Sequence, residues 1–320
     1  MQMLTDHPAE AKKDEGSPAI RVDGLTKRFR GRAAVTDLSV EVPRGVVAGF
    51  VGPNGAGKTT TLRILLGLVR PTSGTGAVLG RSIEDPASYL GRVGGLVEGP
   101  AFHPALSGRR NLEVLAILGG HDVAEVPPLL DDVGLLSRAD DAYRTYSLGM
   151  KQRLGIAGAL LGGPELLLLD EPSNGLDPAG IREMRELIGS LARAHRTILV
   201  SSHLLTEVEQ VCDWLVMIDK GRLVFQGPTA DLMASAVTSL VIAPRDQRHL
   251  ESLRALLVST GYVVDRDEDH LTVAVDGEDP RALGADINRS AMDNGIVLAE
   301  LHHSRAGLEE TYMSMVGGAQ

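Results

Sequence analysis

Hydrophobic and polar positions alternate along the first two thirds of the chain in the rhythm of a parallel α/β domain. Three short apolar runs, residues 46–51, 166–169 and 197–201, each end at polar residues. Runs of this length with few polar positions predict strands that are buried on both faces of a sheet. Longer amphipathic patterns of helical period separate them. We therefore predict a mostly parallel sheet covered by helices, with polar side chains at the carboxyl ends of its strands, where such sheets bind ligands.

A different pattern lies between the first two predicted strands. Residues 89–163 show helical periodicity, with Leu112, Leu115 and Ala116 on one face, and Pro127-Pro128 interrupts it. Proline inside a helix removes a backbone hydrogen bond, so we expect a break there. The segment is predicted to be an inserted, mainly helical subdomain.

The pattern changes again after Gly227-Pro228. Residues 234–320 predict a small α+β domain with elements in the order βαββαβ, which is typical of a ferredoxin-like sandwich. The expected elements are a strand at 239–242, a helix at 247–259, strands at 262–265 and 271–275, a helix at 280–293, a strand at 296–301 and a final helix at 308–315. The chain thus divides into a polar tail predicted to be disordered (1–18), a first domain (19–233) and a C-terminal domain (234–320).

Composition limits the classes of function. With 320 residues, 43% of them hydrophobic, the chain can bury a full core. Its net charge of −10 argues against nucleic acid as the main partner, because binding to the phosphate backbone needs clustered Lys and Arg. The longest uncharged stretch, 154–164, is far shorter than the roughly 18 to 20 apolar residues that cross a bilayer. Any membrane role must therefore come through a partner.

A glycine-rich run follows the first predicted strand and precedes a helical pattern: Gly52-Pro53-Asn54-Gly55-Ala56-Gly57-Lys58-Thr59-Thr60. Strand, glycine-rich loop and helix in this order predict a phosphate-binding loop. Glycines let consecutive backbone N–H groups turn toward phosphate oxygens, and the helix N-terminus adds partial positive charge. Lys58 is expected to reach the β- and γ-phosphates of a nucleotide, and Thr59 to bind the Mg²⁺ that accompanies a nucleoside triphosphate.

Two carboxylates, Asp170 and Glu171, stand at the end of the second predicted strand. A buried acidic pair is costly without a cation or a shared proton, and Mg²⁺ removes that cost. We expect Asp170 to help hold the metal and Glu171 to polarise the water that attacks the γ-phosphate. The alternative is that Asp170 only caps the turn before Pro172.

These motifs, together with Tyr146-Ser147-Leu148-Gly149-Met150-Lys151-Gln152-Arg153, resemble the nucleotide-binding subunits of ATP-binding cassette (ABC) transporters over residues 20–229. The resemblance implies a P-loop α/β cassette with a mostly parallel core sheet, an antiparallel β part and a helical subdomain. Ser147 and Gly149 match the family signature, which binds the γ-phosphate of ATP held by a second subunit. A plain helix cap at Ser147 is the alternative.

Three further positions follow the order of the family's motifs. The run Ser173-Asn174-Gly175-Leu176-Asp177 resembles the loop that crosses the dimer interface, where Asp177 is the residue implicated. His203, just after the third predicted strand, matches the switch histidine that contacts the γ-phosphate and the attacking water. Phe29 matches the aromatic residue that stacks on adenine, and core packing is the alternative for it.

One position departs from the family pattern. Residues 96–100 correspond to the family's Q-loop, but Glu98 stands where glutamine is usual. A carboxylate still offers an oxygen to Mg²⁺, so we expect Glu98 at the nucleotide and metal site. Its negative charge beside the triphosphate would raise the metal requirement or slow hydrolysis. The alternative is that Glu98 points to solvent and only the shape of the loop matters.

The resemblance also implies the partners. In this family each ATP lies between the phosphate loop of one subunit and the signature of another, so a head-to-tail dimer is expected, here with a second copy of the chain. The membrane permease would be a separate polypeptide, which places this protein at the cytoplasmic face of a bacterial membrane. The Glu98 loop, the signature and the C-terminal domain are similar to those of ABC-2-type exporters, which implies ATP-driven efflux of antibiotics, drugs or peptides.

Two other classes of protein remain as alternatives. A soluble ABC ATPase that regulates or remodels ribosomes or DNA usually carries two cassettes or a long coiled-coil insertion, and the sequence shows neither. A P-loop kinase or GTPase is disfavoured by the signature run and by the separate pair Asp170-Glu171.

Overall fold

The computed structural model describes residues 16–193, 196–234, 238–275, 279–305 and 307–317. The chain divides into two compact units, one up to Pro228 and one from Thr229 onward. The division falls at the change of pattern after Gly227-Pro228, slightly before the boundary expected at 233. Most of the tail predicted at 1–18 lies outside the described residues. Among those described, no helix has both the length and the apolar character that crossing a bilayer requires.

A six-stranded sheet forms the centre of the first unit, in the order β10-β9-β3-β8-β7-β6. All pairs are parallel except β10 with β9. The predicted parallel sheet is therefore confirmed. Its strands are β3 (Val47–Val51), β6 (Val93–Leu96), β7 (Leu166–Asp170), β8 (Thr197–Ser202), β9 (Trp214–Asp219) and β10 (Arg222–Pro228).

An antiparallel sheet of order β2-β1-β4-β5 packs against this centre. Its strands are β1 (Ile20–Phe29), β2 (Arg32–Val42), β4 (Ser73–Val78) and β5 (Arg81–Ser82). One core of buried residues joins the two sheets through helix α1 (Lys58–Leu65), with Leu38 of β2, Leu62 of α1 and Leu168 of β7 among its members. Phe29, at the end of β1 in the hairpin of β1 and β2, lines the same cleft as the first residues of α1.

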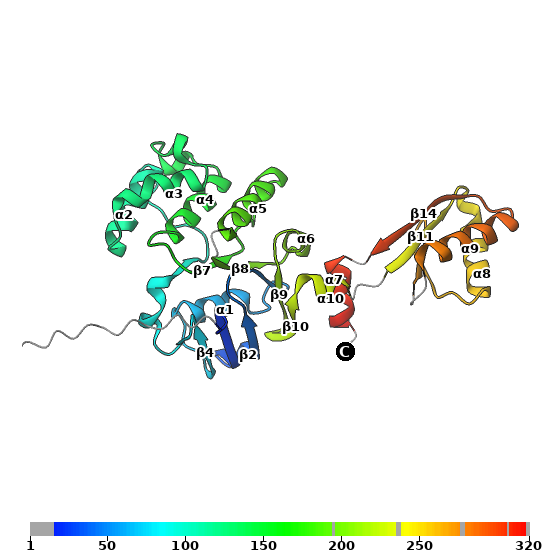
Figure 1. Ribbon diagram of the computed structural model, residues 1–320, viewed down its shortest axis with the longest axis horizontal. Helices are drawn as coiled ribbons and strands as arrows, with labels where there is room; N and C mark the ends of the chain where they lie inside the picture. The colour runs from blue at the N-terminus through cyan, green and yellow to red at the C-terminus, as the bar shows by residue number, and fades with distance from the viewer. Residues whose placement is uncertain (1–15, 194–195, 235–237, 276–278, 306, 318–320) are drawn as a thin grey trace, which may run out of the picture. The chain divides into compact units, whose positions relative to one another are not determined.

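The helical part of the first unit consists of α2 (Gly108–Gly119), α3 (Val126–Asp132) and α4 (Leu148–Ala159), which pack on one another (Figure 1). Two expectations for 89–163 were wrong in detail. Pro127-Pro128 lies in the first turn of α3 and so begins a helix, because the first backbone N–H groups of a helix need no partner within it. Residues 93–96 form β6 of the central sheet; Gly94 permits this, since a Cβ there would lie 1.9 Å from the Ala159 carbonyl oxygen.

The second unit has the predicted order of elements and the sheet order β12-β13-β11-β14, antiparallel throughout. This is a ferredoxin-like sandwich, with α8 and α9 side by side on one face of the sheet (Figure 1). Leu240, Leu253 and Ile287 belong to its own core. The elements are α7 (Thr229–Ala234), β11 (Thr238–Pro244), α8 (Leu250–Ser259), β12 (Val264–Arg266), β13 (Leu271–Ala274), α9 (Pro280–Asp293), β14 (Leu298–Arg305) and α10 (Leu308–Gly317), of which α10 packs on α7.

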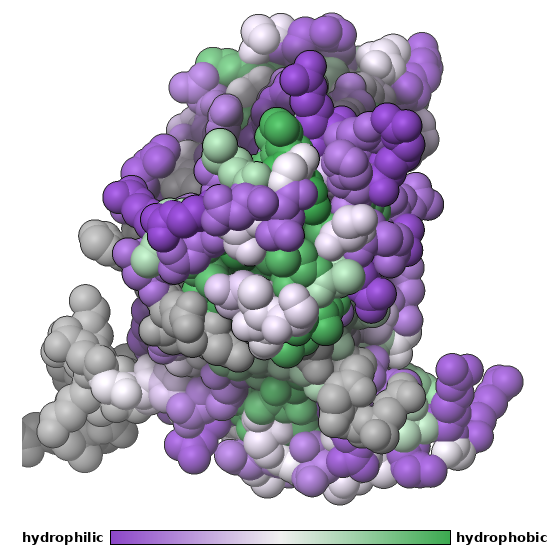
Figure 2. All heavy atoms as spheres, turned by 90° about the vertical axis from the view of Figure 1, so that its right-hand side faces the viewer, coloured by the Kyte–Doolittle hydropathy of each residue, from purple (hydrophilic) through white to green (hydrophobic). Residues whose placement is uncertain are grey.

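The surface of the molecule is mixed rather than uniformly polar. Figure 2, which faces the right-hand side of Figure 1, shows apolar atoms gathered in a band between hydrophilic side chains. The exposed large apolar residues of the second unit include Val258, Val263, Met292 and Val297.

Candidate active site

The glycine-rich loop connects β3 to α1, and two of its glycines are required by close contacts. A Cβ at Gly57 would lie 2.5 Å from the Ala34 carbonyl oxygen, and the φ of Gly57 is +107°. A Cβ at Gly52 would lie 2.3 Å from the Ile218 carbonyl oxygen. Gly57 is also the cap residue of α1, so Thr59 and Thr60 lie in the first helical turn, where backbone N–H groups have no partner within the helix. The loop thus forms a cradle for an anion.

Lys58 turns back over this loop. Its ammonium is buried, with a side chain 6% exposed, and donates a hydrogen bond of 2.6 Å to the Gly52 carbonyl oxygen. The same Nζ lies 3.1 Å from Oε1 of Glu171. A buried ammonium is stable only with such partners, and Glu171 supplies the charge that neutralises Lys58.

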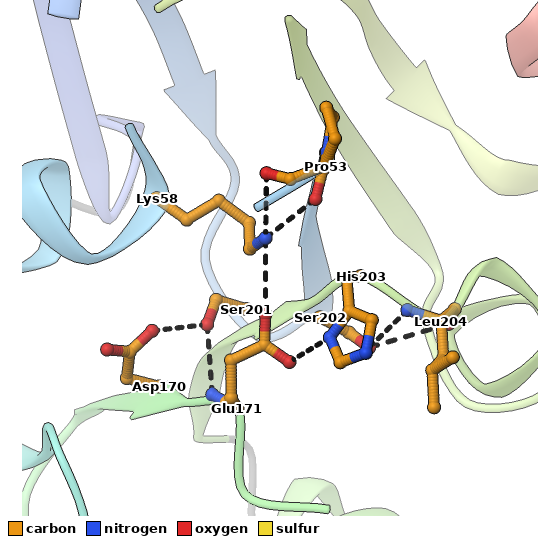
Figure 3. Close-up of polar contacts among 9 residues, drawn as sticks. Pro53, Lys58, Asp170, Glu171, Ser201, Ser202, His203 and Leu204 are labelled. Carbon is orange, nitrogen blue, oxygen red and sulfur yellow. Dashed lines mark hydrogen bonds and ion pairs between the residues drawn. The ribbon is translucent and has the colours of Figure 1, made fainter. Parts of the chain in front are cut away.

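Glu171 links two of the predicted catalytic side chains (Figure 3). One carboxylate oxygen is paired with Lys58, and the other, Oε2, lies 2.7 Å from Nδ1 of His203. Glu171 has a φ of +49°, an uncommon conformation for a residue with a side chain. Strain of this kind is characteristic of functional positions. The fold therefore brings together Lys58, Glu171 and His203, which lie far apart in the sequence.

Ser201 is a site residue that the sequence analysis missed. Its Oγ donates a hydrogen bond of 2.6 Å to Oδ1 of Asp170 and accepts one of 2.9 Å from the backbone N–H of Glu171. The parallel register of β7 and β8 pairs Asp170 with Ser201. The available signal was a hydroxyl at the carboxyl end of a buried strand, but the register that aligns it with Asp170 is not visible in the sequence.

Lys58, Glu171 and His203 line a cleft of about 700 Å³. Phe29 lines it and is 45% exposed, so core packing is excluded for this ring. Arg32, Asn174 and Lys220 also line the cleft and were not predicted. The full lining is Phe29, Arg32, Ala33, Ala34, Asn54, Gly55, Ala56, Gly57, Lys58, Thr59, Thr60, Glu171, Asn174, His203 and Lys220.

Seven predicted site residues lie outside the lining of this cleft: Gly52, Pro53, Glu98 and Asp170, and three at helix N-termini, Ser147, Gly149 and Asp177. The hydroxyl of Ser147 caps α4 and accepts a hydrogen bond from the backbone N–H of Met150, at 3.3 Å. Asp177 caps α5 (Pro178–Ala192) and accepts from the backbone N–H of Gly180, at 2.8 Å. Gly149 lies in the first turn of α4. Each of these three residues stands at a helix N-terminus, where an acceptor or anion is favoured.

Glu98 is not placed where the sequence analysis expected it. Its side chain is 65% exposed and forms an ion pair with Arg63 of α1, and it does not line the cleft. The backbone φ of Glu98 is +64°. The guanidinium of Arg63 supplies the opposite charge that we had expected Mg²⁺ to supply. In this structure Glu98 therefore connects the loop after β6 to α1 rather than contributing to the metal site.

The remaining residues fit Mg²⁺. This ion is usually held by one or two carboxylates together with substrate phosphates and water, rather than by a cage made only of protein groups. Asp170 supplies a carboxylate, and Thr59 supplies a hydroxyl in the first turn of α1. Within the described residues, no group of three or more His, Cys, Asp and Glu side chains could hold a metal ion.

A further carboxyl, that of Glu207, lies beneath the site on α6 (Leu205–Glu209). Burial raises the pKa of Glu207, and this effect outweighs a hydrogen bond from Ser173 that lowers it. Its Oε1 is buried and has no hydrogen-bond partner among the described residues. The Cys212 thiol lines the same small cavity, and burial raises its pKa to about 12.

Comparison with known proteins agrees with this geometry. Residues 35–174 match the ABC transporter family. The chain is 38% identical to the bacitracin transport ATP-binding protein BcrA of Bacillus licheniformis, over 94% of this chain and 98% of that protein. It is 33% identical to the daunorubicin/doxorubicin resistance ATP-binding protein DrrA of Streptomyces peucetius, over 93% and 92% of the two chains.

Solved structures give the same result for the first unit. The structure of an ATP-binding subunit of an ABC transporter matches with a TM-score of 0.60 and 31% identity, covering 68% of this chain and 92% of that one. With this fold and these relatives, the chain belongs to the ABC transporter family as one of its ATP-binding, ATP-hydrolysing subunits.

Proposed function

We propose that this chain powers export of an antibiotic, drug or peptide through a separate membrane permease, by binding and hydrolysing MgATP between two cassettes. The observation that carries the proposal is the chain of contacts from Lys58 through Glu171 to His203 at the nucleotide cleft. Export of this class of cargo is supported by the relatives, which are named for bacitracin transport, lantibiotic transport and daunorubicin/doxorubicin resistance.

Binding of ATP begins with an exchange of partners at Lys58. The backbone N–H groups of the loop and of the start of α1 receive the phosphates, and the ammonium leaves Glu171 for the β- and γ-phosphate oxygens. The exposed ring of Phe29 provides a face on which adenine stacks. When bound, Mg²⁺ neutralises charge on the phosphates, and Thr59 and Asp170 are the residues that would hold it.

Hydrolysis then depends on Glu171 and His203. The carboxylate of Glu171 accepts a proton from water as the water oxygen forms a bond to the γ-phosphorus. The bond from that phosphorus to the bridging oxygen breaks, and the bridging oxygen keeps the electron pair as part of ADP. His203, whose Nδ1 lies 2.7 Å from Oε2 of Glu171, orients the carboxylate and contacts the γ-phosphate in this proposal. Lys58 stabilises the negative charge that develops on the phosphate oxygens.

A second cassette would complete the site. Ser147 and Gly149 present the N-terminus of α4 outside the chain's own cleft, and Asp177 does the same for α5. In the proposed head-to-tail dimer, α4 of one copy faces the γ-phosphate bound to the other, where its unpaired N–H groups and partial positive charge are favourable. ATP thereby closes the dimer, and hydrolysis with product release opens it.

The helical part of the first unit offers a surface for the permease. The second half of α2 exposes four large apolar side chains, those of Val114, Leu115, Ile117 and Leu118. Exposed apolar groups gathered on one helix mark an interaction site. We propose that they contact the permease at the cytoplasmic face of the bacterial membrane.

The proposal is tested by size-exclusion chromatography with light scattering on Glu171→Gln, with and without MgATP. Without proton transfer to residue 171 the closed state should accumulate, so a monomer should become a dimer when MgATP is added. Lys58→Ala is the control and should remain monomeric. A wild-type rate of ATP hydrolysis in Glu171→Gln would contradict the assigned role of Glu171. Transport is then measured as efflux from cells that carry the permease.

A further inference from the structure

Ser201 occupies an unusual position relative to the two acidic residues. It is fully buried, with 0% of its surface exposed, and lies near the carboxyl end of β8. Its hydroxyl contacts both members of the acidic pair on the neighbouring strand, the side chain of Asp170 and the backbone of Glu171 (Figure 3). The backbone N–H of Glu171 also lies 3.2 Å from the Ser201 carbonyl oxygen.

The Ser201 hydroxyl both donates and accepts a hydrogen bond. A serine hydroxyl has one proton to donate and two lone pairs that accept. Here the proton goes to Oδ1 of Asp170, at 2.6 Å, and a lone pair receives the N–H of Glu171, at 2.9 Å. The first bond fixes the orientation of the Asp170 carboxylate. The second holds Glu171 where its backbone takes a φ of +49°, in the conformation whose side chain reaches Lys58 and His203.

We propose that Ser201 is a positioning residue for ATP hydrolysis, whose single hydroxyl fixes the metal-binding carboxylate of Asp170 and the backbone of Glu171 as one unit. The inference rests on the roles proposed above for Asp170 and Glu171. Partners that orient a metal ligand act on both metal affinity and rate, because a freely rotating carboxylate must be ordered each time the ion binds. Ser201 is buried and does not line the nucleotide cleft.

The test compares Ser201→Ala with a control on the same strand. Thr197→Val removes another buried hydroxyl of β8, one that accepts from the backbone N–H of Gly45 at the opposite end of the strand. Ser201→Ala loses two buried hydrogen bonds and Thr197→Val loses one, so the thermal stability of both variants is measured beside their kcat. Only Ser201→Ala should lower kcat, by about 10- to 100-fold.

A second readout does not depend on activity. The affinity of the protein for Mn²⁺ in the presence of a non-hydrolysable ATP analogue is measured by electron paramagnetic resonance, and Ser201→Ala should weaken it about tenfold or more. Its affinity for the nucleotide in the presence of EDTA should remain that of the wild type. Ser201→Cys keeps the side-chain volume with a much weaker donor, and should act in the same direction if Ser201→Ala folds poorly. Ser201→Thr keeps the hydroxyl and should restore most of the rate.

The outcomes separate the inference from the proposed function. If Ser201→Ala and Ser201→Cys match Thr197→Val in kcat and in Mn²⁺ affinity while Glu171→Gln is inactive, Ser201 is only structural and the inference fails alone. If Glu171→Gln hydrolyses ATP at the wild-type rate, the proposed role of Glu171 fails, and the inference fails with it.

Discussion

At the scale of single residues, the site depends on positions that accept only one type of residue. Gly57 has a φ of +107° and a carbonyl oxygen 2.5 Å from where a Cβ would lie, so any other residue must displace β2 or change the loop. Glu171, in contrast, has a side chain at positive φ, and its backbone is held there by a hydrogen bond to Ser201. The backbone of the site is therefore set by both kinds of residue.

Gly57→Ala should abolish nucleotide binding and lower the stability of the first unit by more than about 1 kcal/mol. The matched control is Gly189→Ala in α5, where a Cβ would meet nothing within 4 Å. Alanine there should raise stability by roughly 0.5–1 kcal/mol, because glycine is costly inside a helix. Calorimetry and binding of a fluorescent nucleotide check both variants. Wild-type nucleotide affinity in Gly57→Ala would contradict the account of the loop.

The raised pKa of Glu207 predicts that the stability of the folded protein depends on pH. Because burial raises the pKa of this carboxyl, the folded protein binds its proton more tightly than the unfolded chain does. The contribution of this carboxyl to the free energy of unfolding is fully present below its pKa in the unfolded chain, and it is lost as the pH rises through its pKa in the folded protein. Glu207→Gln does not titrate, so its melting temperature relative to the wild type should be higher at pH 8 than at pH 4. Thermal scans at the two values test this, and a constant difference would refute it.

At the scale of elements, much of the fold follows from patterns that lie within one segment. The strands β3, β7 and β8 agree with the predicted runs to within one residue at each end, because a continuous apolar run encodes burial on both faces. β6 was missed because Val93-Gly94-Gly95-Leu96 carries only two apolar side chains. Glycine is needed at position 94 because the end of α4 lies too close for a Cβ there.

The parts of the site that could not be predicted depend on contacts between segments. Ser201 reaches Asp170 through the register of β7 with β8, across 31 residues of sequence. Glu98 pairs with Arg63, which belongs to a different element. Motif spacing predicts Glu171 and His203 at strand ends and Lys58 at the start of a helix, but it does not show which charged side chains each of them will contact.

The N-terminus of α4 allows helix capping to be separated from dimer formation. Ser147→Asp keeps an acceptor at the cap, so stability should be nearly unchanged. Its charge would face the triphosphate of the partner, and ATP-dependent dimerisation should be lost. Ser107→Asp is the control, because Ser107 caps α2 in the same way through the backbone N–H of Arg110. Light scattering with MgATP measures whether each variant forms a dimer, and a dimer of Ser147→Asp would exclude the proposed position of α4.

At the scale of the whole molecule, two cores make two units. The first unit has a core shared by its two sheets and α1, and the second has its own core around Leu240 and Leu253. The phosphate loop, the acidic pair and His203 all belong to the first unit.

Removal of residues 229–320 should therefore spare ATP binding and weaken dimerisation or coupling to transport. Equilibrium binding of MgATP and light scattering on the shortened chain measure the two effects. Loss of all nucleotide affinity in a shortened chain that remains folded by circular dichroism would show that the second unit is part of the nucleotide site.

The contact between Lys58 and Glu171 sets a charge requirement for a ligand of Lys58. Because the ammonium and the carboxylate satisfy each other, a ligand gains little from Lys58 unless it carries enough negative charge to replace Glu171. A triphosphate brings that charge, whereas a single inorganic phosphate brings much less. We propose that Glu171 then keeps His203 as its neighbour, so that its carboxylate is free to accept a proton from water only when a triphosphate has bound.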